Sequence, residues 1–596
     1  MHLSTLDWSF IAAFFILSLV IGLVVSKRAG KSASEYFLSG RSMPWWLLGF
    51  SMVATTFSAD TPNLVTDIVR KNGVSGNWQW WAFLLTGMLT VFVYAKLWRR
   101  SGVLTDLEFY ELRYSGKAAA FLRGFRAIYL GVFFNVMIMA TVSLAAIKIG
   151  GVLLGLSPIQ TILIASIVTV IYTSLGGLTG VIWTDFFQFI VAMIGVTWAA
   201  IVVVNLPQVG GLSNLLTHPN VAPKLSVLPD FNDMSALLPF LIMPLAIQWW
   251  SVWYPGAEPG GGGYIAQRML SAKNETHAIG ATLFFNFVHY ALRPWPWILV
   301  ALASLIVFPD LASLKTAFPN LPDNVINDDL AYPAMMTFLP SGLLGLIVAA
   351  LIAAYMSTIA THLNWGSSYV VNDFYKRFIK PEASEKEQVN VGRLTTVVLM
   401  FFSALLALAL TNALQAFNIL LQIGAGTGLI FILRWFWWRI NAWSEISAMI
   451  ISFAAAVFFE LIAPKMNLDI APHLKLVSGV AITTLGWVIV TLLTQPTADA
   501  TLLKFYKLIK PHATGWQAVI RPAIAKGELR EAEVVAGKLP LELVCMFTGC
   551  FLVYGALFGI GFLVYGEMGK AAIGFAVVVI ATWILSRSWS QVKGQS

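Results

Sequence analysis

Long runs of apolar residues, separated by short polar connections, extend along most of the 596 residues. A helix needs about 20 apolar residues to cross the ~30 Å hydrocarbon layer of a bilayer, and runs of this kind recur along the chain. The predicted spans are 7–26, 45–71, 77–98, 122–155, 157–175, 178–205, 235–255, 277–308, 331–375, 391–411, 413–437, 443–463, 473–494, 541–565 and 569–587. The pattern therefore predicts an all-α membrane protein with about 15 transmembrane helices.

Basic residues cluster in every second connection between these runs, for example in 27–41, 96–126 and 376–393. The opposite connections carry acidic residues such as Asp230 and Asp310. Cytoplasmic loops of membrane proteins carry an excess of Lys and Arg, so we expect the N-terminus outside and the C-terminus in the cytoplasm. This distribution attributes the net charge of +9 to topology rather than to nucleic-acid binding.

Composition leaves no room for a large soluble domain. Only 11% of the residues are charged and 58% are hydrophobic, whereas soluble domains carry about 25% charged residues.

The two cysteines, Cys545 and Cys550, share one apolar run at a spacing that points their side chains apart on a helix. We therefore expect two small buried side chains rather than a disulfide.

Two places in the predicted spans contain residues that interrupt a regular helix. In 45–71, the polar stretch 58–61 precedes Pro62, which lacks a backbone N–H and disfavours helical geometry at the residue before it. Later, the sequence PGAEPGGGG at 255–263 contains two prolines and four consecutive glycines. Backbone at membrane depth is irregular only where protein shields it or where it lines a cavity. The alternative for either break is a proline kink without a ligand role.

The two breaks fall in the first span of each half when the chain from residue 45 is divided into two groups of five spans. Paired interruptions at corresponding positions indicate an inverted repeat with a central binding site. We therefore expect a five-plus-five inverted-repeat transporter fold. Its expected parts are a leading helix and cytoplasmic loop at 1–44, a core at 45–440 with repeats at 45–205 and 235–437, and accessory helices at 441–596 with an amphipathic cytoplasmic loop at 495–540.

Hydroxyl residues gather in one of the later spans. Ser357, Thr358 and Thr361 lie among small residues, and Asn364 follows one turn on. Sodium is a hard cation that takes about five or six oxygen ligands, by analogy with other hard cations. An unwound helix exposes carbonyl oxygens, so a helix with hydroxyl groups facing a break predicts a sodium site. The alternative is that these hydroxyls hydrogen-bond to the carbonyls of their own helix.

Ionisable residues inside the predicted spans indicate function, unless they lie at span ends and extend to the interface. They are Asp60, Asp185, Glu258, His289 and Arg293.

Four ordered segments resemble the sodium:solute symporter family, which includes sodium/glucose, sodium/proline and sialic acid transporters. They are SEYFLSGRSMPWW from Ser34, YTSLGGLTGVIWTDFFQ from Tyr172, YIAQRMLSAK from Tyr264, and AYMSTIATHLN from Ala354 followed by VNDFYKRF. The resemblance implies the five-plus-five fold, a leading helix and extra C-terminal helices. It also implies a bacterial cytoplasmic (inner) membrane as the location.

The resemblance implies which residues bind sodium. The expected ligands are the carbonyl oxygens of Ala54, Phe57 and Ala354 and the hydroxyl groups of Ser357 and Thr358. Some relatives hold a second sodium, for which Asp185 and Thr361 are the matching residues. Ala360 lacks the further hydroxyl that such a site uses.

The resemblance also implies a solute site between the two broken helices. Its expected residues are Thr56, Ser58, Asp60, Thr61, Gln79, Tyr264 as an inner gate, His289 and Gln422. The segments PGAEPGGGG and FVHYALRPWPW depart from the family pattern, which leaves the solute open. A sugar or polyol is favoured, and an amino acid, a carboxylate or another metabolite is the alternative.

The expected function is sodium-coupled symport of a small polar solute by alternating access, with sodium as the coupling ion and no organic cofactor. A cation channel would need a continuous polar pathway or repeated filter loops, and the sequence has neither. An enzyme is not indicated, because no Walker motif, zinc-ligand cluster or nucleophile elbow appears. A transport-linked sensor would need an appended signalling domain, and the chain ends soon after the last predicted span.

Overall fold

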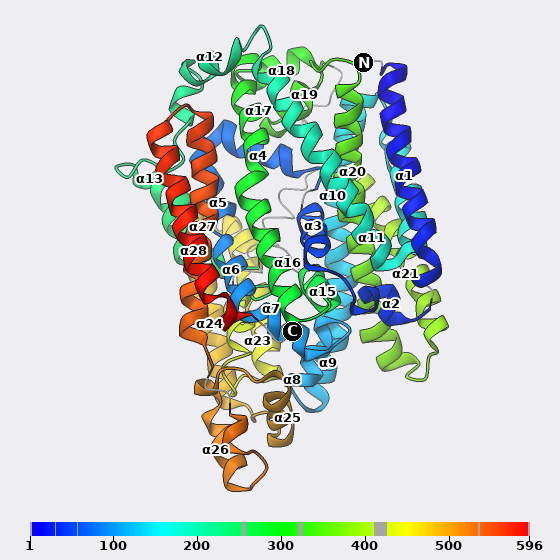
Figure 1. The fold of residues 1–596 in the computed structure, drawn as a ribbon, viewed down its shortest axis with the longest axis vertical. Coiled ribbons are helices and arrows are strands. Elements are labelled where there is room, and N and C mark those ends of the chain that lie inside the picture. The colour runs from blue at the N-terminus through cyan, green and yellow to red at the C-terminus, as the bar shows by residue number, and fades with distance from the viewer. Residues whose placement is uncertain are drawn as a thin grey trace.

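A computed structural model describes residues 3–29, 31–56, 58–252, 258–319, 326–410, 426–534 and 537–593. Every regular element in these ranges is helical. Most of the long helices run roughly along the longest axis of the molecule, and α25 (Asp499–Ile509) and α26 (Gln517–Ala525) lie at one end of it (Figure 1).

The helices of the N-terminal half alternate between long spans and short pieces. They are α1 (Thr5–Ala29), α2 (Ala33–Leu38), α3 (Trp45–Thr55), α4 (Thr61–Asn72), α5 (Trp78–Trp81), α6 (Leu84–Leu89), η3 (Thr90–Tyr94), α7 (Ala95–Ser101), η4 (Asp106–Glu108), α8 (Phe109–Arg113), α9 (Gly116–Ile128), η5 (Tyr129–Phe134), α10 (Asn135–Ile149), η6 (Gly150–Leu154), α11 (Pro158–Val204) and α12 (Gly211–Thr217).

The helices of the C-terminal half follow the same alternation. They are α13 (Met234–Leu237), η8 (Leu238–Ile242), α14 (Met243–Ala246), η9 (Gln248–Trp250), α15 (Gly263–Ser271), α16 (Glu275–Phe287), η10 (Val288–Leu292), α17 (Pro294–Val307), α18 (Leu311–Ala317), α19 (Ala331–Met336), α20 (Leu343–Ser368), η13 (Tyr369–Ile379), α21 (Glu385–Ala409), α23 (Ala442–Val457), α24 (Pro472–Leu493), α27 (Leu539–Val564) and α28 (Met568–Val592).

Eleven helices among the described residues are long and apolar enough to cross a membrane, where the sequence predicts about 15 spans. Four predicted spans account for the difference. The span 45–71 divides into α3 and α4, the spans 157–175 and 235–255 contain only shorter apolar helices, and much of 413–437 lies outside the described residues.

The boundary between the predicted spans 157–175 and 178–205 is a kink inside α11. Gly177 lies there with a φ of +53°, in the left-handed region that favours glycine. A Cβ atom at this position would lie 2.7 Å from the carbonyl oxygen of Tyr36 on α2. The kink therefore depends on a close approach of two backbones. α11 packs against α1 and α20.

The cytoplasmic loop predicted at 495–540 folds onto the helical core. The apolar sides of α25 and α26 are buried, and α25 packs against α7 and α8. The indole N–H of Trp516 donates to the carbonyl oxygen of Trp435 at 3.0 Å, and its ring stacks on Phe505 with 5.4 Å between the ring centroids. Arg113 on α8 lies over the ring of Trp516 at 4.8 Å. These amphipathic helices therefore bury their apolar side in protein.

The two C-terminal helices α27 and α28 pack against each other. Cys545 and Cys550 are free and buried in α27, which confirms the expectation of two unpaired thiols. α27 also contacts α6 and η10, so this hairpin lies against the core.

Candidate functional site

The predicted break near residue 60 is present in the structure. α3 ends at Thr55 and α4 begins at Thr61, with Pro62 in its first turn, where the missing N–H costs no helical hydrogen bond. The C-terminal carbonyls of α3 and the N-terminal amides of α4 have no partners within their own helices. The break therefore places the negative end of one helix and the positive end of another at the same point.

The hydroxyl groups of α20 lie against this break. Thr358 Oγ1 donates to the carbonyl oxygen of Thr55 at 3.0 Å, and Thr361 Oγ1 lies 3.0 Å from Thr55 Oγ1. Ser357 Oγ donates to Asp185 Oδ1 on α11 at 2.7 Å. These bonds join α20 to other elements, rather than returning to its own carbonyls. The structure therefore brings the predicted hydroxyl helix and the predicted break together.

A buried cation lies next to this contact. Arg268 on α15 has no exposed side-chain surface, and its Nη2 lies 3.6 Å from Asp185 Oδ2 and 2.7 Å from Thr361 Oγ1. Asp185 also accepts a hydrogen bond from Ser51 Oγ at 2.5 Å. Asp185 and Thr361, expected at a second sodium, thus lie together but already face a positive charge. Arg268 is not among the intramembrane charges predicted from the sequence, although the segment YIAQRMLSAK contains it.

A cavity of about 270 Å³ opens at the break. Residues of the predicted solute site line it, namely Thr56, Ser58, Asp60, Thr61, Gln79 and His289. Other residues of its lining are Trp80, Thr141, Gln248, Arg293, Thr358 and His362. Tyr264 lines a smaller neighbouring cavity instead. Phe57 and Gln422 lie outside the described residues. Thr358 of α20 therefore both lines the cavity and bonds to the end of α3.

Arg293 closes the C-terminal end of α3. Its Nη1 donates to the carbonyl oxygen of Val53 at 3.0 Å, and its Nη2 donates to that of Thr56 at 3.1 Å. Nη2 also lies 2.5 Å from Nδ1 of His289. A guanidinium at the negative end of a helix is favourable, and it satisfies carbonyls that the break leaves open. Arg293 therefore lines the cavity while two of its donors hold the backbone.

Aromatic rings form another side of the cavity. Trp80 stacks on Tyr290 with 5.8 Å between centroids and 23° between planes, and it meets His289 edge to face at 5.7 Å. Gln248 Nε2 donates to the backbone carbonyl of Gln79 at 2.8 Å, which joins η9 to α5. The cavity thus combines hydroxyl and amide groups with an aromatic face.

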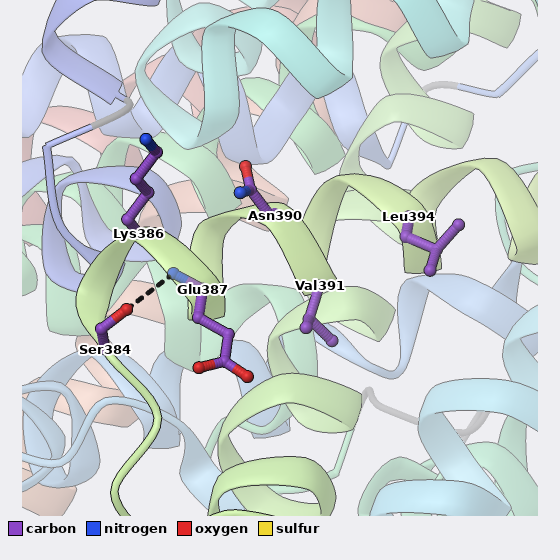
Figure 2. A pocket seen from close by; sticks show the side chains of 6 residues that line it. All are labelled: Ser384, Lys386, Glu387, Asn390, Val391 and Leu394. Carbon is purple, nitrogen blue, oxygen red and sulfur yellow. Dashed lines mark hydrogen bonds between the residues drawn. The ribbon is translucent and has the colours of Figure 1, made fainter.

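A second depression, of about 360 Å³, lies at the N-terminal end of α21 and is unrelated to this site. Figure 2 shows that its labelled residues follow one another along a single helix, beginning at Ser384, whose hydroxyl accepts a hydrogen bond from the Glu387 backbone N–H. None of the predicted site residues lines it. It lacks the opposing elements that a solute site would need.

The profile of the sodium:solute symporter family matches residues 36–452. The sodium/glucose cotransporter of Vibrio parahaemolyticus is 28% identical over 485 residues, which cover 78% of this chain and 87% of that protein. The sodium/sialic acid symporter of Proteus mirabilis is 26% identical, with coverage of 76% and 89%. A solved substrate-bound, outward-open structure of a sodium-coupled sialic acid symporter shares the fold, with a TM-score of 0.65 and 22% identity over 83% of this chain and 99% of that one. The chain belongs to the sodium:solute symporter family, whose members are transporters rather than enzymes.

Proposed function

We propose that this protein imports a small polar solute by sodium-coupled symport with alternating access. The observation that carries the proposal is the 3.0 Å contact between Thr358 Oγ1 and the carbonyl oxygen of Thr55, at the wall of the central cavity. An ion bound beside this contact, by Ala54 of α3 and Thr358 of α20, and a solute bound in the cavity would touch the same two helices. Each would therefore favour the arrangement that the other binds.

The proposed sodium ligands are the carbonyl oxygens of Ala54, Phe57 and Ala354 and the hydroxyl groups of Ser357 and Thr358. This donor set suits a hard cation, because all its members are oxygens. Ala54 lies in the last turn of α3, where carbonyls begin to lose helical partners. The hydroxyl hydrogens of Ser357 and Thr358 can rotate away, so that the oxygens face the ion.

We propose a single sodium at this end of the cavity. Arg268 supplies the positive charge that Asp185 needs in its buried surroundings, at 3.6 Å. A sodium ion between Asp185 and Thr361 would have to compete with the guanidinium, which already donates to Thr361. Two cations next to one buried carboxylate would repel each other.

The proposed solute is a sugar or a polyol, bound by Thr56, Ser58, Asp60, Thr61, Gln79 and His289. Charges around the cavity balance, because Asp60 and Arg293 both line it. Hydroxyl and amide side chains can donate and accept, as a polyhydroxylated solute requires. Trp80 offers an aromatic face on which the apolar side of a sugar ring can pack. Sugar and sialic acid transporters among the relatives support this class. An amino acid or a carboxylate is the alternative.

In the proposed cycle, sodium and solute bind from outside and are released to the cytoplasm. The sodium-ordered break completes the solute site, and coupling of this kind typically amounts to about 1–3 kcal/mol, or roughly 5–150-fold in affinity. Rocking of the core then exposes both ligands inside, with Tyr264 as the inner gate. Tyr264 is fully buried and lies 6.0 Å from the ring of His362, which lines the central cavity. This direction assumes an outside N-terminus and a bacterial cytoplasmic membrane.

A thermal-shift screen of the purified protein tests the proposal. Sugars, polyols, amino acids and carboxylates are compared in sodium and in potassium buffer. A solute that raises the melting temperature only with sodium is then followed as radiolabelled uptake into proteoliposomes. Accumulation against its gradient, lost in potassium, is expected. Sodium conduction without any solute would instead identify a channel, and equal uptake in both buffers would remove sodium coupling.

Asp60→Asn distinguishes the solute classes. The variant removes the negative charge of one hydrogen-bond acceptor, so the affinity for a neutral polyol should fall about tenfold, which corresponds to ~1.4 kcal/mol. The same change should abolish binding of a cationic solute, because its only carboxylate partner among the described cavity residues is removed. Uptake competition with unlabelled solutes measures the difference.

A further inference from the structure

A second, smaller cavity lies next to the central one. Its volume is about 60 Å³, and Phe83, His289 and Tyr290 line both cavities, so these three side chains separate them. The smaller cavity is formed by α6, α15, α16 and η10. In Figure 1, α6 and α15 lie between α3 and the end of the molecule that carries α8 and α25, which is the predicted cytoplasmic end.

Three oxygen atoms in the walls of this cavity have no hydrogen-bond partner among the described residues. They are Glu258 Oε2, Asn286 Oδ1 and Thr86 Oγ1. Glu258 is 6% exposed and Asn286 is 1% exposed. A buried polar atom without a partner costs about 1–3 kcal/mol, so buried acceptors are normally satisfied by protein, water or an ion. Three such acceptors around one small space indicate that something polar fills it.

Glycines keep this space open for two of the oxygens. A Cβ atom on Gly87 would lie 1.9 Å from Asn286 Oδ1, and a Cβ atom on Gly262 would lie 2.0 Å from Glu258 Oε2. No side chain could therefore stand at either position without displacing a wall of the cavity. Residues 258–262 thus contribute both the Glu258 carboxylate and the space around its Oε2 atom.

Two buried carboxylates lie at this cavity: Glu258 lines it, and Asp106 bonds to Gly263, which follows the lining residue Gly262. Glu258 pairs with Arg126 at 2.5 Å. Asp106 accepts hydrogen bonds from the Tyr369 hydroxyl at 2.5 Å and from the Gly263 N–H at 2.9 Å, so its neighbours do not neutralise it. The next pair outward, Arg434 and Glu445, neutralises itself. Among the described residues, Arg126 is ion-paired with Glu258, whereas Asp106 forms no ion pair. A buried carboxylate without an ion pair is costly unless hydrogen bonds or a cation offset its charge.

We propose that the smaller cavity is a second cation site, where sodium pauses between the central site and the cytoplasm. This inference rests on the proposed sodium coupling. Its ligands are Glu258 Oε2, Asn286 Oδ1 and Thr86 Oγ1, and the remaining positions of the coordination shell are filled by water or backbone carbonyls. Movement of Phe83, His289 and Tyr290 would connect the two sites. Waters alone are the other occupant that such a space could hold.

Equilibrium binding of radioactive sodium to the purified full-length protein tests this site. The wild-type protein should show two binding components. The double variant Thr86→Val, Asn286→Leu keeps the approximate shape of both side chains but removes two oxygens, and it should lose only the weaker component. Ser357→Ala should lose only the tighter one. Thr548→Val is the matched control, because Thr548 on α27 bonds to its own helix at Val544.

The outcomes separate the two proposals. If the double variant binds sodium as the wild-type protein does, the cavity holds only water and the proposed second site is ruled out. Unchanged binding in Ser357→Ala overturns the central sodium site, whatever the double variant does. Asn286→Asp covers the case in which the double variant fails to fold. It adds a charged oxygen at the same place and should tighten the weaker component about tenfold. An unaltered weaker component in Asn286→Asp also counts against the site.

Discussion

The hydroxyl of Thr358 on α20 donates a 3.0 Å hydrogen bond to the carbonyl oxygen of Thr55, the last residue of α3. In a continuous helix that carbonyl would accept from its own helix four residues on. Because the helix stops, the carbonyl turns to a side chain from a segment about 300 residues later in the chain. The contact therefore brings Thr358, a proposed sodium ligand, to the end of α3 that also carries the proposed ligand Ala54.

Removal of the Ser357 hydroxyl should weaken sodium activation. Ser357→Ala takes away one proposed ligand and leaves Asp185 with one fewer hydrogen bond. We expect the half-saturating sodium concentration for solute uptake to rise about tenfold, equivalent to ~1.4 kcal/mol. Ser18→Ala is the control, because this buried serine bonds only along its own helix, to Phe14. Sodium activation that is identical in Ser357→Ala and wild type would remove the proposed site.

Replacement of Arg293 should destabilise the break itself. Arg293→Met leaves the carbonyl oxygen of Thr56 without its guanidinium donor and that of Val53 with only the Thr56 hydroxyl, and a buried unsatisfied group costs about 1–3 kcal/mol. A lower melting temperature in detergent and loss of sodium-dependent uptake are expected together. Arg587→Met, on α28, provides the control. Normal stability in Arg293→Met would show that water replaces the guanidinium without cost.

The kink in α11 should not tolerate a side chain. In Gly177→Ala the new Cβ lies 2.7 Å from the Tyr36 carbonyl oxygen, and the φ of +53° is strained for alanine. We expect a clearly lower melting temperature. Gly479→Ala on α24 is the matched control, because no atom lies within 4 Å of the added Cβ. Alanine there should leave stability unchanged or raise it by about 0.5–1 kcal/mol. Equal melting temperatures for the two variants would contradict the close backbone approach.

Trp516 should hold the cytoplasmic segment in place. Trp516→Ala removes the bond to Trp435 and the stacking on Phe505, and truncation of a buried tryptophan costs about 3–5 kcal/mol. Lys507 and Arg521 are already exposed, and trypsin can cleave after them once the segment around them becomes mobile. Limited trypsin digestion of inside-out vesicles should cut the variant at least about tenfold faster than wild type. Trp583→Ala, at an exposed position of α28, should digest like wild type, and protection of Trp516→Ala would show that other contacts hold the segment.

Proline and polar residues inside an apolar run were sufficient to predict where the first core helix breaks. Pro62 and the polar residues before it cannot continue α3 without losing hydrogen bonds, and the structure ends α3 at Thr55. The hydroxyl group of Thr358 was predicted to face that break, and it does. Eleven helices among the described residues are long enough to cross a membrane, fewer than the 15 predicted spans, because apolar runs such as 45–71 and 235–255 divide into shorter helices and much of 413–437 lies outside the described residues.

The roles of two arginines could not be predicted in the same way. Arg268 neutralises Asp185 from a different helix, and Arg293 caps α3 from about 240 residues away in the chain. A single sequence shows that such charges lie in apolar surroundings, but not which partner each one meets. The same holds for Glu258, whose pairing with Arg126 and position beside the smaller cavity follow from packing alone.

The sequence by itself determined that the chain forms membrane helices, where the first of them breaks, and which helix carries the hydroxyl groups. These features depend on local chemistry: the length of apolar runs, the missing N–H of proline and the spacing of side chains along a helix. Only the tertiary structure decided which carboxylate a buried arginine such as Arg268 neutralises. It also decided which buried oxygen atoms among the described residues lack a hydrogen-bond partner. Electrostatic energy inside a protein depends on distances between groups far apart in the chain, and folding alone sets those distances.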